Sequence, residues 1–272
     1  RMSEEWSSYW KKEDKNQMIQ DMLHNMKSIK TLKFRLKKQE RIDGKMIRGD
    51  QIAKVQVSPF KVYVKVFEPD KGAEVLYVSG QRDGDALVNP NKFPYVNLNL
   101  SPYGGILRKN QHHTIHELGF NYMHGIVKDA YNRFKDKVDE FVIYEGMVEW
   151  NGQQCHKVII DNKDFAWENY TVKNGEDVLD IAKENFVSEY MIMEYNKSID
   201  DYDDVDAGQT IKIPNTYCRK IVFYLDKETL LPIYQKLWDD KGLFAEYEYH
   251  NLELNPSISS AEFTSDYEDY DY

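Results

Sequence analysis

Apolar residues recur at helical spacing near the start of the chain, over residues 4–29. The stripe consists of Trp6, Trp10, Met18, Ile19, Met22, Leu23, Met26 and Ile29. Spacing of three and four residues predicts an amphipathic helix whose apolar face packs against a core. Residues 113–134 repeat this pattern and predict a second amphipathic helix, with Thr114 as a candidate N-cap and Glu117 three positions later completing a capping box.

Elsewhere the pattern changes to the period of two that is typical of half-buried strands. Residues 31–42 alternate apolar and charged side chains, Asp43 and Gly44 form a turn, and residues 46–57 alternate again. Asn151 and Gly152 separate another such pair. Further alternating segments lie at residues 60–69, 74–80, 139–150, 153–162, 217–226, 233–240 and 243–254. The pattern predicts an α+β fold in which helices flank an antiparallel meander.

One segment, residues 169–214, interrupts the meander and has a different pattern. It predicts a short strand at 170–172, a helix with Ile181 on its apolar face, a second helix capped by Ser188, and a closing strand that ends at Pro214. When this βααβ segment is removed, the flanking strands join into one continuous meander. The host domain is therefore expected to be discontinuous, comprising residues 1–167 and 217–272, with the insert at 168–216.

The insert resembles the LysM domain, a small module that binds peptidoglycan and chitin. The matching positions are Tyr170, Thr171, Val172, Gly175, Ile181, Ala182, Val187, Ser188, Ile192, Asn196, Gly208, Gln209, Ile211, Ile213 and Pro214. In that family, glycans that contain N-acetylglucosamine lie in a shallow groove between two loops. The resemblance implies a glycan-binding groove formed by Gly175, Glu176, Asp177 and Val178 on one side and Asn196, Lys197, Ser198 and Ile199 on the other.

Three departures from the family pattern bear on that groove. Glu176 and Asp177 stand where the family usually has Asp-Thr, Leu179 replaces a frequent aromatic residue, and residues 200–206 are strongly acidic. Acidic loops repel the carboxylates of peptidoglycan stem peptides. A LysM fold that is kept only as a structural or protein-binding insert is the alternative, because fold does not fix function.

The host domain resembles the lipoprotein-carrier superfamily (LolA/LolB-like). The resemblance rests on Asp226 to Thr229 with Leu231 and Pro232, on Asp239 with Gly242, and on Asn255, Ile258 and Phe263. Residues 101–120 are also similar to a segment of an uncharacterised bacterial envelope family in this superfamily. The resemblance implies a curved antiparallel sheet, a half-barrel with helices on its concave side, whose apolar interior can hold acyl chains. An ordinary packed core would show the same alternation.

Charge and composition narrow the classes of partner. A formal net charge of −10 argues against nucleic acid as a partner, because phosphate binding needs a basic surface. No apolar run is long enough to span a membrane, and residues 1–10 lack the apolar stretch of a signal peptide, although a signal or lipid anchor could precede this chain. Cys155 and Cys218 are too few for a disulfide framework and are expected to be free and mostly buried.

Three histidines, His112, His113 and His116, form the most conspicuous cluster of candidate chemistry. Helical spacing could place two of them on one face, yet the His-Glu-x-x-His order of zinc hydrolases is absent. No nucleophile elbow or phosphate-binding glycine loop occurs either. We therefore expect no catalytic residue, metal or cofactor, and treat the histidines as a candidate site at the mouth of the barrel.

These observations together favour a non-enzymatic protein of the periplasm or cell envelope. Its LysM module would bind peptidoglycan, and its host domain would bind a lipid, a lipoprotein or another apolar ligand. Two alternatives remain open. One is a cell-wall or metal-dependent hydrolase that the LysM module targets to its substrate, and the other is a scaffold for envelope proteins.

Overall fold

The structure is a computed structural model that describes residues 12–272, so the predicted positions of Trp6 and Trp10 lie outside the described residues. The chain folds into two compact units. Among the described residues, the first unit comprises 12–24 together with Met123–Phe244. The second unit comprises Asn25–Tyr122 and Ala245–Tyr272.

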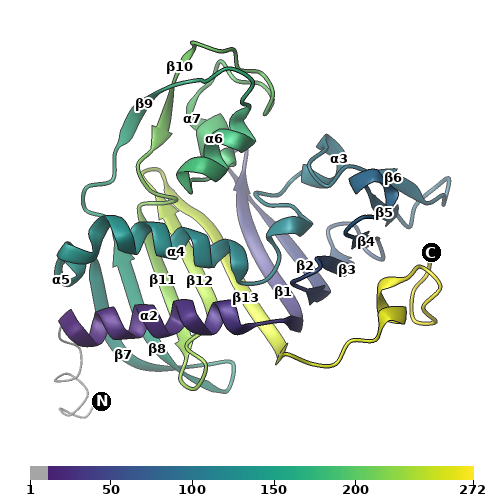
Figure 1. Ribbon diagram of the computed structural model, residues 1–272, viewed down its shortest axis with the longest axis horizontal. Coiled ribbons are helices and arrows are strands. Elements are labelled where there is room, and N and C mark those ends of the chain that lie inside the picture. Colours follow the sequence, from purple (N-terminus) through teal and green to yellow (C-terminus); the bar gives the residue numbers. More distant parts are fainter. Residues whose placement is uncertain (1–11) are drawn as a thin grey trace. The chain divides into compact units, whose positions relative to one another are not determined.

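The first unit contains an antiparallel sheet covered by helices. Its strands pair in the order β12 (Pro232–Asp239), β11 (Lys220–Asp226), β8 (Gln153–Asp161) and β7 (Val142–Trp150). Helices α2 (Lys12–Ser28) and α4 (Asn121–Phe134) lie side by side across these strands (Figure 1). The short helices η3 (Lys135–Lys137) and α5 (Val138–Phe141) lead from α4 into β7. Met18, Ile19 and Met22 of α2 are buried, as the apolar stripe predicted.

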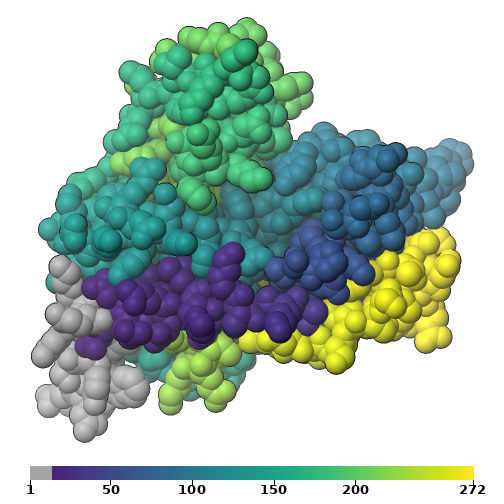
Figure 2. Space-filling model, viewed as in Figure 1, coloured from purple at the N-terminus to yellow at the C-terminus, as the bar shows by residue number. Residues whose placement is uncertain are grey.

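The predicted βααβ segment occurs within the first unit. It consists of β9 (Trp167–Thr171), α6 (Val178–Asn185), α7 (Glu189–Tyr195) and β10 (Thr210–Pro214). The two strands pair with each other, Trp167 opposite Pro214. The segment has a hydrophobic cluster of its own, Val172, Val178, Ile181, Ala182, Val187, Ile192, Ile199, Ile211 and Ile213. It forms a separate lobe of the unit, green in Figure 2.

The ends of this lobe lie close together on the sheet. Strands β8 and β11 flank the segment in sequence and pair directly, with Asp161 opposite Lys220. The chain therefore leaves the sheet and returns to it at adjacent strands, which is the geometry that an insertion into a hairpin requires.

The second unit is an antiparallel sheet with short helical turns. Its strands are β1 (Thr31–Ile42), β2 (Lys45–Gln56), β3 (Lys61–Glu68), β4 (Glu74–Val78), β5 (Ala86–Asn89), β6 (Leu98–Leu100) and the part of β13 (Gly242–Leu254) from Ala245. They pair in the order β6-β5-β4-β3-β2-β1-β13. The turns are η1 (Arg82–Gly84), α3 (Gly105–Arg108), η2 (Ile115–Glu117) and η4 (Ser260–Phe263). Antiparallel sheets with separate helices confirm the predicted α+β class.

The second predicted helix begins later than its pattern indicated. Residues Ile115–Glu117 form only a single 3₁₀ turn, and Thr114 makes no side-chain capping bond there. Gly119 then adopts φ +93°, a conformation that ends the turn, and α4 begins at Asn121. The capping box predicted at Thr114 and Glu117 is therefore wrong, because a left-handed glycine separates these residues from the helix.

The aromatic and acidic C-terminus docks on the sheet of the second unit. Tyr270 stacks on Tyr63 with ring centroids 3.6 Å apart. The backbone N–H of Asp271 donates to Glu74 Oε1 at 2.9 Å, and Asn89 Nδ2 donates to the Asp271 carbonyl at 2.9 Å. These bonds fix the last residues against β3, β4 and β5, so this terminus is part of the folded unit.

Candidate functional site

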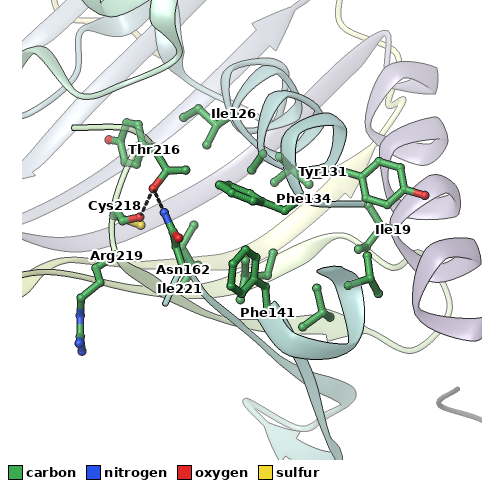
Figure 3. A pocket seen from close by; sticks show the side chains of 16 residues that line it. Ile19, Ile126, Tyr131, Phe134, Phe141, Asn162, Thr216, Cys218, Arg219 and Ile221 are labelled. Carbon is green, nitrogen blue, oxygen red and sulfur yellow. Dashed lines mark hydrogen bonds between the residues drawn. The ribbon is translucent and has the colours of Figure 1, made fainter. Parts of the chain in front are cut away.

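The first unit contains an apolar pocket between its helices and its sheet (Figure 3). Ile126, Val127, Ala130 and Phe134 line one wall from α4, and Phe141 of α5 closes it. Their spacing along α4 places them on one helical face. The rings of Phe134 and Phe141 meet edge to face with centroids 4.9 Å apart. The opposite wall comes from β8, β11 and the residues that lead into β11, namely Ile160, Asn162, Thr216, Tyr217, Cys218, Arg219 and Ile221.

The polar groups in that wall bond to one another. Asn162 Nδ2 donates to Thr216 Oγ1 at 3.0 Å, and the Thr216 hydroxyl donates to the Cys218 carbonyl at 2.8 Å, as Figure 3 shows. Burial, with a smaller contribution from the charge of Asp239, raises the pKa of Cys218 and keeps its thiol neutral. Arg219 is the one charged residue in the lining, and its side chain is exposed. The wall is therefore neutral and apolar toward the cavity.

The size of the pocket limits what it can hold. Its free volume is about 60 Å³. A water molecule needs roughly 10–15 Å³ on this measure, so the pocket in this conformation admits a short apolar group and not a whole lipid. A longer chain would have to leave the pocket through its opening or displace the rings of Phe134 and Phe141.

The predicted histidine cluster lies in the second unit, where His112 is fully buried. His112 Nε2 lies 2.7 Å from the Arg41 carbonyl, and its Nδ1 lies 3.7 Å from the carboxylate of Glu40. Glu40 also accepts from the hydroxyl of Tyr247 at 2.5 Å and forms an ion pair with Lys38 at 3.0 Å. His112 is thus part of a buried polar cluster around Glu40.

Electrostatics keep Glu40 ionised in that cluster. Burial alone would raise its pKa, but Lys38, then His112 and His113, and the hydrogen bond from Tyr247 outweigh burial and lower the pKa of Glu40 to about 2. Burial also lowers the pKa of His113 to about 3, against the attraction of Glu40. Near neutral pH the cluster therefore holds an ionised Glu40 and a neutral His113.

His113 and His116 have different surroundings. His113 lies 4.0 Å from the Glu117 carboxylate and meets the ring of Tyr122 edge on. The His116 ring packs among the aromatic rings of Phe60, Tyr77 and Tyr103, with centroids 4.5 to 5.3 Å away. The ring centroids of His112 and His113 lie 6.3 Å apart, but His116 lies in a separate aromatic cluster.

The eight predicted glycan-binding residues differ in burial and in hydrogen bonding within the βααβ lobe. Val178 and Ile199 are buried in its core. Asn196 Nδ2 donates to the carbonyls of Ile192 and Lys212, both at 2.8 Å, and Asn196 Oδ1 accepts from the Lys212 N–H at 2.9 Å. The Asn196 side chain therefore links the end of α7 to β10 and has a structural role.

The first loop of the lobe is also shaped by its own side chains. Asp177 caps α6 by accepting from the Asp180 N–H at 2.8 Å, and Glu176 accepts from the Tyr170 hydroxyl at 2.7 Å. Burial, followed by the Glu176 hydrogen bond, raises the pKa of Tyr170 to about 12. Of the eight positions, only Gly175, Lys197 and Ser198 are exposed.

The two loops flank the same core. The Val178 N–H donates to the Tyr202 carbonyl at 2.8 Å, which joins the first loop to the acidic segment that follows the second. The exposed aspartates of that segment are Asp200, Asp201, Asp203, Asp204 and Asp206. The surface beside the loops is therefore strongly negative.

The pocket residues were not among the sites predicted from the sequence. The apolar face of α4 was visible in the pattern, but a face that lines a cavity has the same spacing as one that fills a core. Asn162 and Thr216 lie 54 positions apart on either side of the βααβ lobe, and no local motif links them.

A family model described as "Protein of unknown function (DUF1571)" matches residues 29–198. No curated protein matches the chain. Among similar solved structures, lipoprotein LppX of Mycobacterium tuberculosis is 9% identical, with 90% of this chain and 97% of that chain covered and a TM-score of 0.42. A DUF1329 family protein from Desulfovibrio piger ATCC 29098 is 12% identical, with 92% and 96% covered and a TM-score of 0.35.

A LolA superfamily protein from Nitrosomonas europaea is 8% identical, with 93% of this chain and 98% of that chain covered and a TM-score of 0.34. Identities and TM-scores this low do not bear on function. No helix among residues 12–272 is long and apolar enough to cross a membrane.

Proposed function

The chain belongs to the family described as "Protein of unknown function (DUF1571)", and from this premise we propose that it is a non-enzymatic binding protein of the periplasm or cell envelope. Its ligand is an apolar group, such as the acyl chain of a lipid or lipoprotein. The observation that carries the proposal is the pocket of the first unit, whose cavity-facing walls are apolar and whose polar groups bond to one another.

The chemistry of the lining favours binding over catalysis. The 16 residues that line the pocket include no histidine, aspartate or glutamate to act as a general base. The thiol of Cys218 is held neutral by burial, and a neutral thiol is a poor nucleophile. A ligand that enters this pocket meets hydrocarbon and the four aromatic rings of Tyr131, Phe134, Phe141 and Tyr217, which retain it without reacting with it.

The half-barrel that the lipoprotein-carrier resemblance implies is part of this proposal, as is the division into a host domain at residues 1–167 and 217–272 and a LysM domain at 168–216. The independent core of the βααβ lobe supports the LysM assignment. Through this lobe the protein would bind peptidoglycan or another glycan that contains N-acetylglucosamine. Gly175, Lys197 and Ser198 would contact the glycan, while Glu176, Asp177, Val178, Asn196 and Ile199 would shape the loops.

The histidines have a smaller place in the proposal. His112 is fully buried and hydrogen-bonded, so it serves the cluster around Glu40. A binding edge would rest on His113 and on His116 with its aromatic neighbours Tyr77 and Tyr103.

Extraction of the purified protein tests the apolar ligand. Protein prepared from bacterial envelopes without detergent is extracted with organic solvent, and the extract is analysed by mass spectrometry. The proposal expects an acyl-containing compound in stoichiometric amount from the native protein. An extract that matches that of an unrelated acidic protein prepared in the same way would contradict it.

Sedimentation with insoluble peptidoglycan tests the glycan function. The full chain is expected to pellet with peptidoglycan, and Lys197→Glu with Ser198→Trp should reduce the bound fraction several-fold by adding charge and bulk at the exposed positions. The control is Lys183→Glu on the exposed side of α6. Asn196 is unsuitable as a test because its loss would disturb the lobe itself. Equal retention of all variants, or none of the wild type, would refute glycan binding at these loops.

A further inference from the structure

A short stretch of the second unit exposes an unusual number of large apolar side chains. Nine large hydrophobic residues are exposed among the described residues, and six of them lie within residues 93–106. The six are Phe93 (86% exposed), Tyr95 (71%), Val96 (49%), Leu98 (39%), Tyr103 (44%) and Ile106 (67%). Figure 2 shows this part of the chain, in blue, at the surface. Exposed apolar clusters of this kind mark sites of interaction.

The backbone holds these side chains in place from both ends. The Asn91 N–H donates to the Asn89 side chain at 3.0 Å, and Asn91 Nδ2 donates to the Lys71 carbonyl at 3.1 Å. The Tyr95 N–H closes a turn on the Lys92 carbonyl at 2.7 Å. Beyond the turn, β6 pairs with β5, Leu98 opposite Val88. The exposed turn at Phe93 to Val96 therefore lies between the hydrogen-bonded Asn91 and strand β6.

The charge of this stretch is opposite to that of the chain. The protein has 46 aspartates and glutamates in 272 residues, yet residues 86–116 contain none. The same stretch contains Lys92 and Lys109, both exposed, and Arg108, whose guanidinium lies over the Tyr103 ring at 5.8 Å. The adjoining turn carries Asp70 and Lys71, one charge of each sign. An apolar surface with basic flanks complements a surface that is both apolar and anionic.

We propose that residues 92–109 dock the protein on a lipid bilayer that contains anionic lipids. Phe93, Tyr95 and Ile106 would enter the interfacial region, where aromatic rings are favoured, and Lys92 and Lys109 would contact the headgroups. A second copy of this chain fits the same patch less well, because two copies that each carry a net charge of −10 repel each other. This docking surface is independent of the ligand pocket in the first unit.

Flotation of the full chain with vesicles tests the proposal. Vesicles of phosphatidylcholine with phosphatidylglycerol are compared with vesicles of phosphatidylcholine alone. The wild type is expected to float with the anionic vesicles and to bind the neutral ones at least tenfold less. Phe93→Ser and Ile106→Ser should each lower the bound fraction several-fold, and Lys92→Glu with Lys109→Glu at least tenfold.

Matched controls separate docking from general effects. Ile143→Ser changes an exposed isoleucine elsewhere, and Lys163→Glu with Lys183→Glu makes the same charge change outside the patch. Both should float like the wild type, and so should the pocket variant Ala130→Phe. Absence of flotation, or equal loss in patch and control variants, overturns the proposal. Self-association that Phe93→Ser abolishes, without any flotation, also overturns it by showing that a second copy covers the patch.

Discussion

At the scale of single residues, Glu40 is expected to cause much of the pH dependence of the second unit's stability. This carboxylate is 1% exposed and is held by Lys38, Tyr247 and the nearby His112. A buried charge is tolerated only when partners replace its hydration. The cluster is therefore stable as a whole and vulnerable to the loss of any one charge.

Acidification should destabilise the second unit through these groups. The pKa of Glu40 is lowered from about 4.5 to about 2, so the unfolded state binds its proton first and stability is lost as the pH falls from about 4.5 to about 2. The lowered pKa of His113, about 3, acts in the same direction below pH 6.5. Glu40 alone corresponds to a loss on the order of 3 kcal/mol. Hydrogen exchange of the β1 amides across this pH range measures this loss of stability.

Glu40→Gln should remove the part of the acid-dependent stability loss that Glu40 causes. It should also destabilise the second unit by about 3–5 kcal/mol at neutral pH, because Lys38, whose side chain is only 11% exposed, loses its charge partner. The control is Glu184→Gln, which breaks an ion pair with Lys173 whose side chains are more than half exposed, and it should cost less than about 1 kcal/mol. Equal effects of the two substitutions would show that the cluster does not hold its charges as described.

The sequence revealed the histidines of this cluster but not their environment. His112 stands out beside His113, yet Glu40 lies 72 positions before it and Tyr247 lies 135 positions after it. Pairing of β1 with β13 brings Glu40 near Tyr247, and His112 reaches them from a loop. Single-sequence patterns contain no information about such long-range contacts. Burial of His112 could not be anticipated because a polar residue in a loop is usually exposed.

At the scale of elements, the βααβ lobe depends on one side chain that joins α7 to β10. The three hydrogen bonds of Asn196 satisfy backbone groups at the end of the helix and on the strand. Such groups would otherwise remain unpaired, because a helix end has carbonyls without helical partners. A motif residue can thus serve the fold of a lobe, while its neighbours Lys197 and Ser198 are exposed at the surface.

Asn196→Ala should loosen this lobe by about 1–3 kcal/mol, since it leaves the Lys212 amide and two carbonyls without their partner. We expect faster hydrogen exchange at Lys212 and in α7, and unchanged exchange rates in β7 and β8. Asn174→Ala, an exposed asparagine in the same lobe, is the matched control. Unchanged exchange in the Asn196 variant would mean that the hydrogen bonds are not important for the lobe.

Turn chemistry made several elements predictable. Asp43 and Gly44 have φ values of 50° and 77°, and Asn151 and Gly152 have 50° and 75°, the left-handed pairs that tight hairpins need. The βααβ order was equally visible from its helical faces. Strands β5 and β6 were missed because they are short and lie in a stretch rich in proline and asparagine, where tertiary pairing overrides local preference.

At the scale of the whole molecule, two compact units carry different chemistry. The first combines a neutral apolar pocket with the βααβ lobe, and the second combines a buried charged cluster, a docked C-terminus and the apolar stretch at residues 93–106. The three proposed functions, apolar-ligand binding, glycan binding and membrane docking, therefore rest on different sets of residues. We expect that a substitution at one of these sets leaves the other two functions unchanged.

The central claim is that the pocket of the first unit binds an apolar chain. The most direct measurement is titration of the delipidated protein with a fluorescent fatty acid. Wild type and Ala207→Phe, an exposed alanine of the same unit, should bind with the same Kd, while Ala130→Phe should fill the pocket and bind at least tenfold more weakly. If Ala130→Phe does not fold, the smaller Ala130→Met takes its place. Equal Kd values for the wild type and a folded pocket variant would contradict the claim.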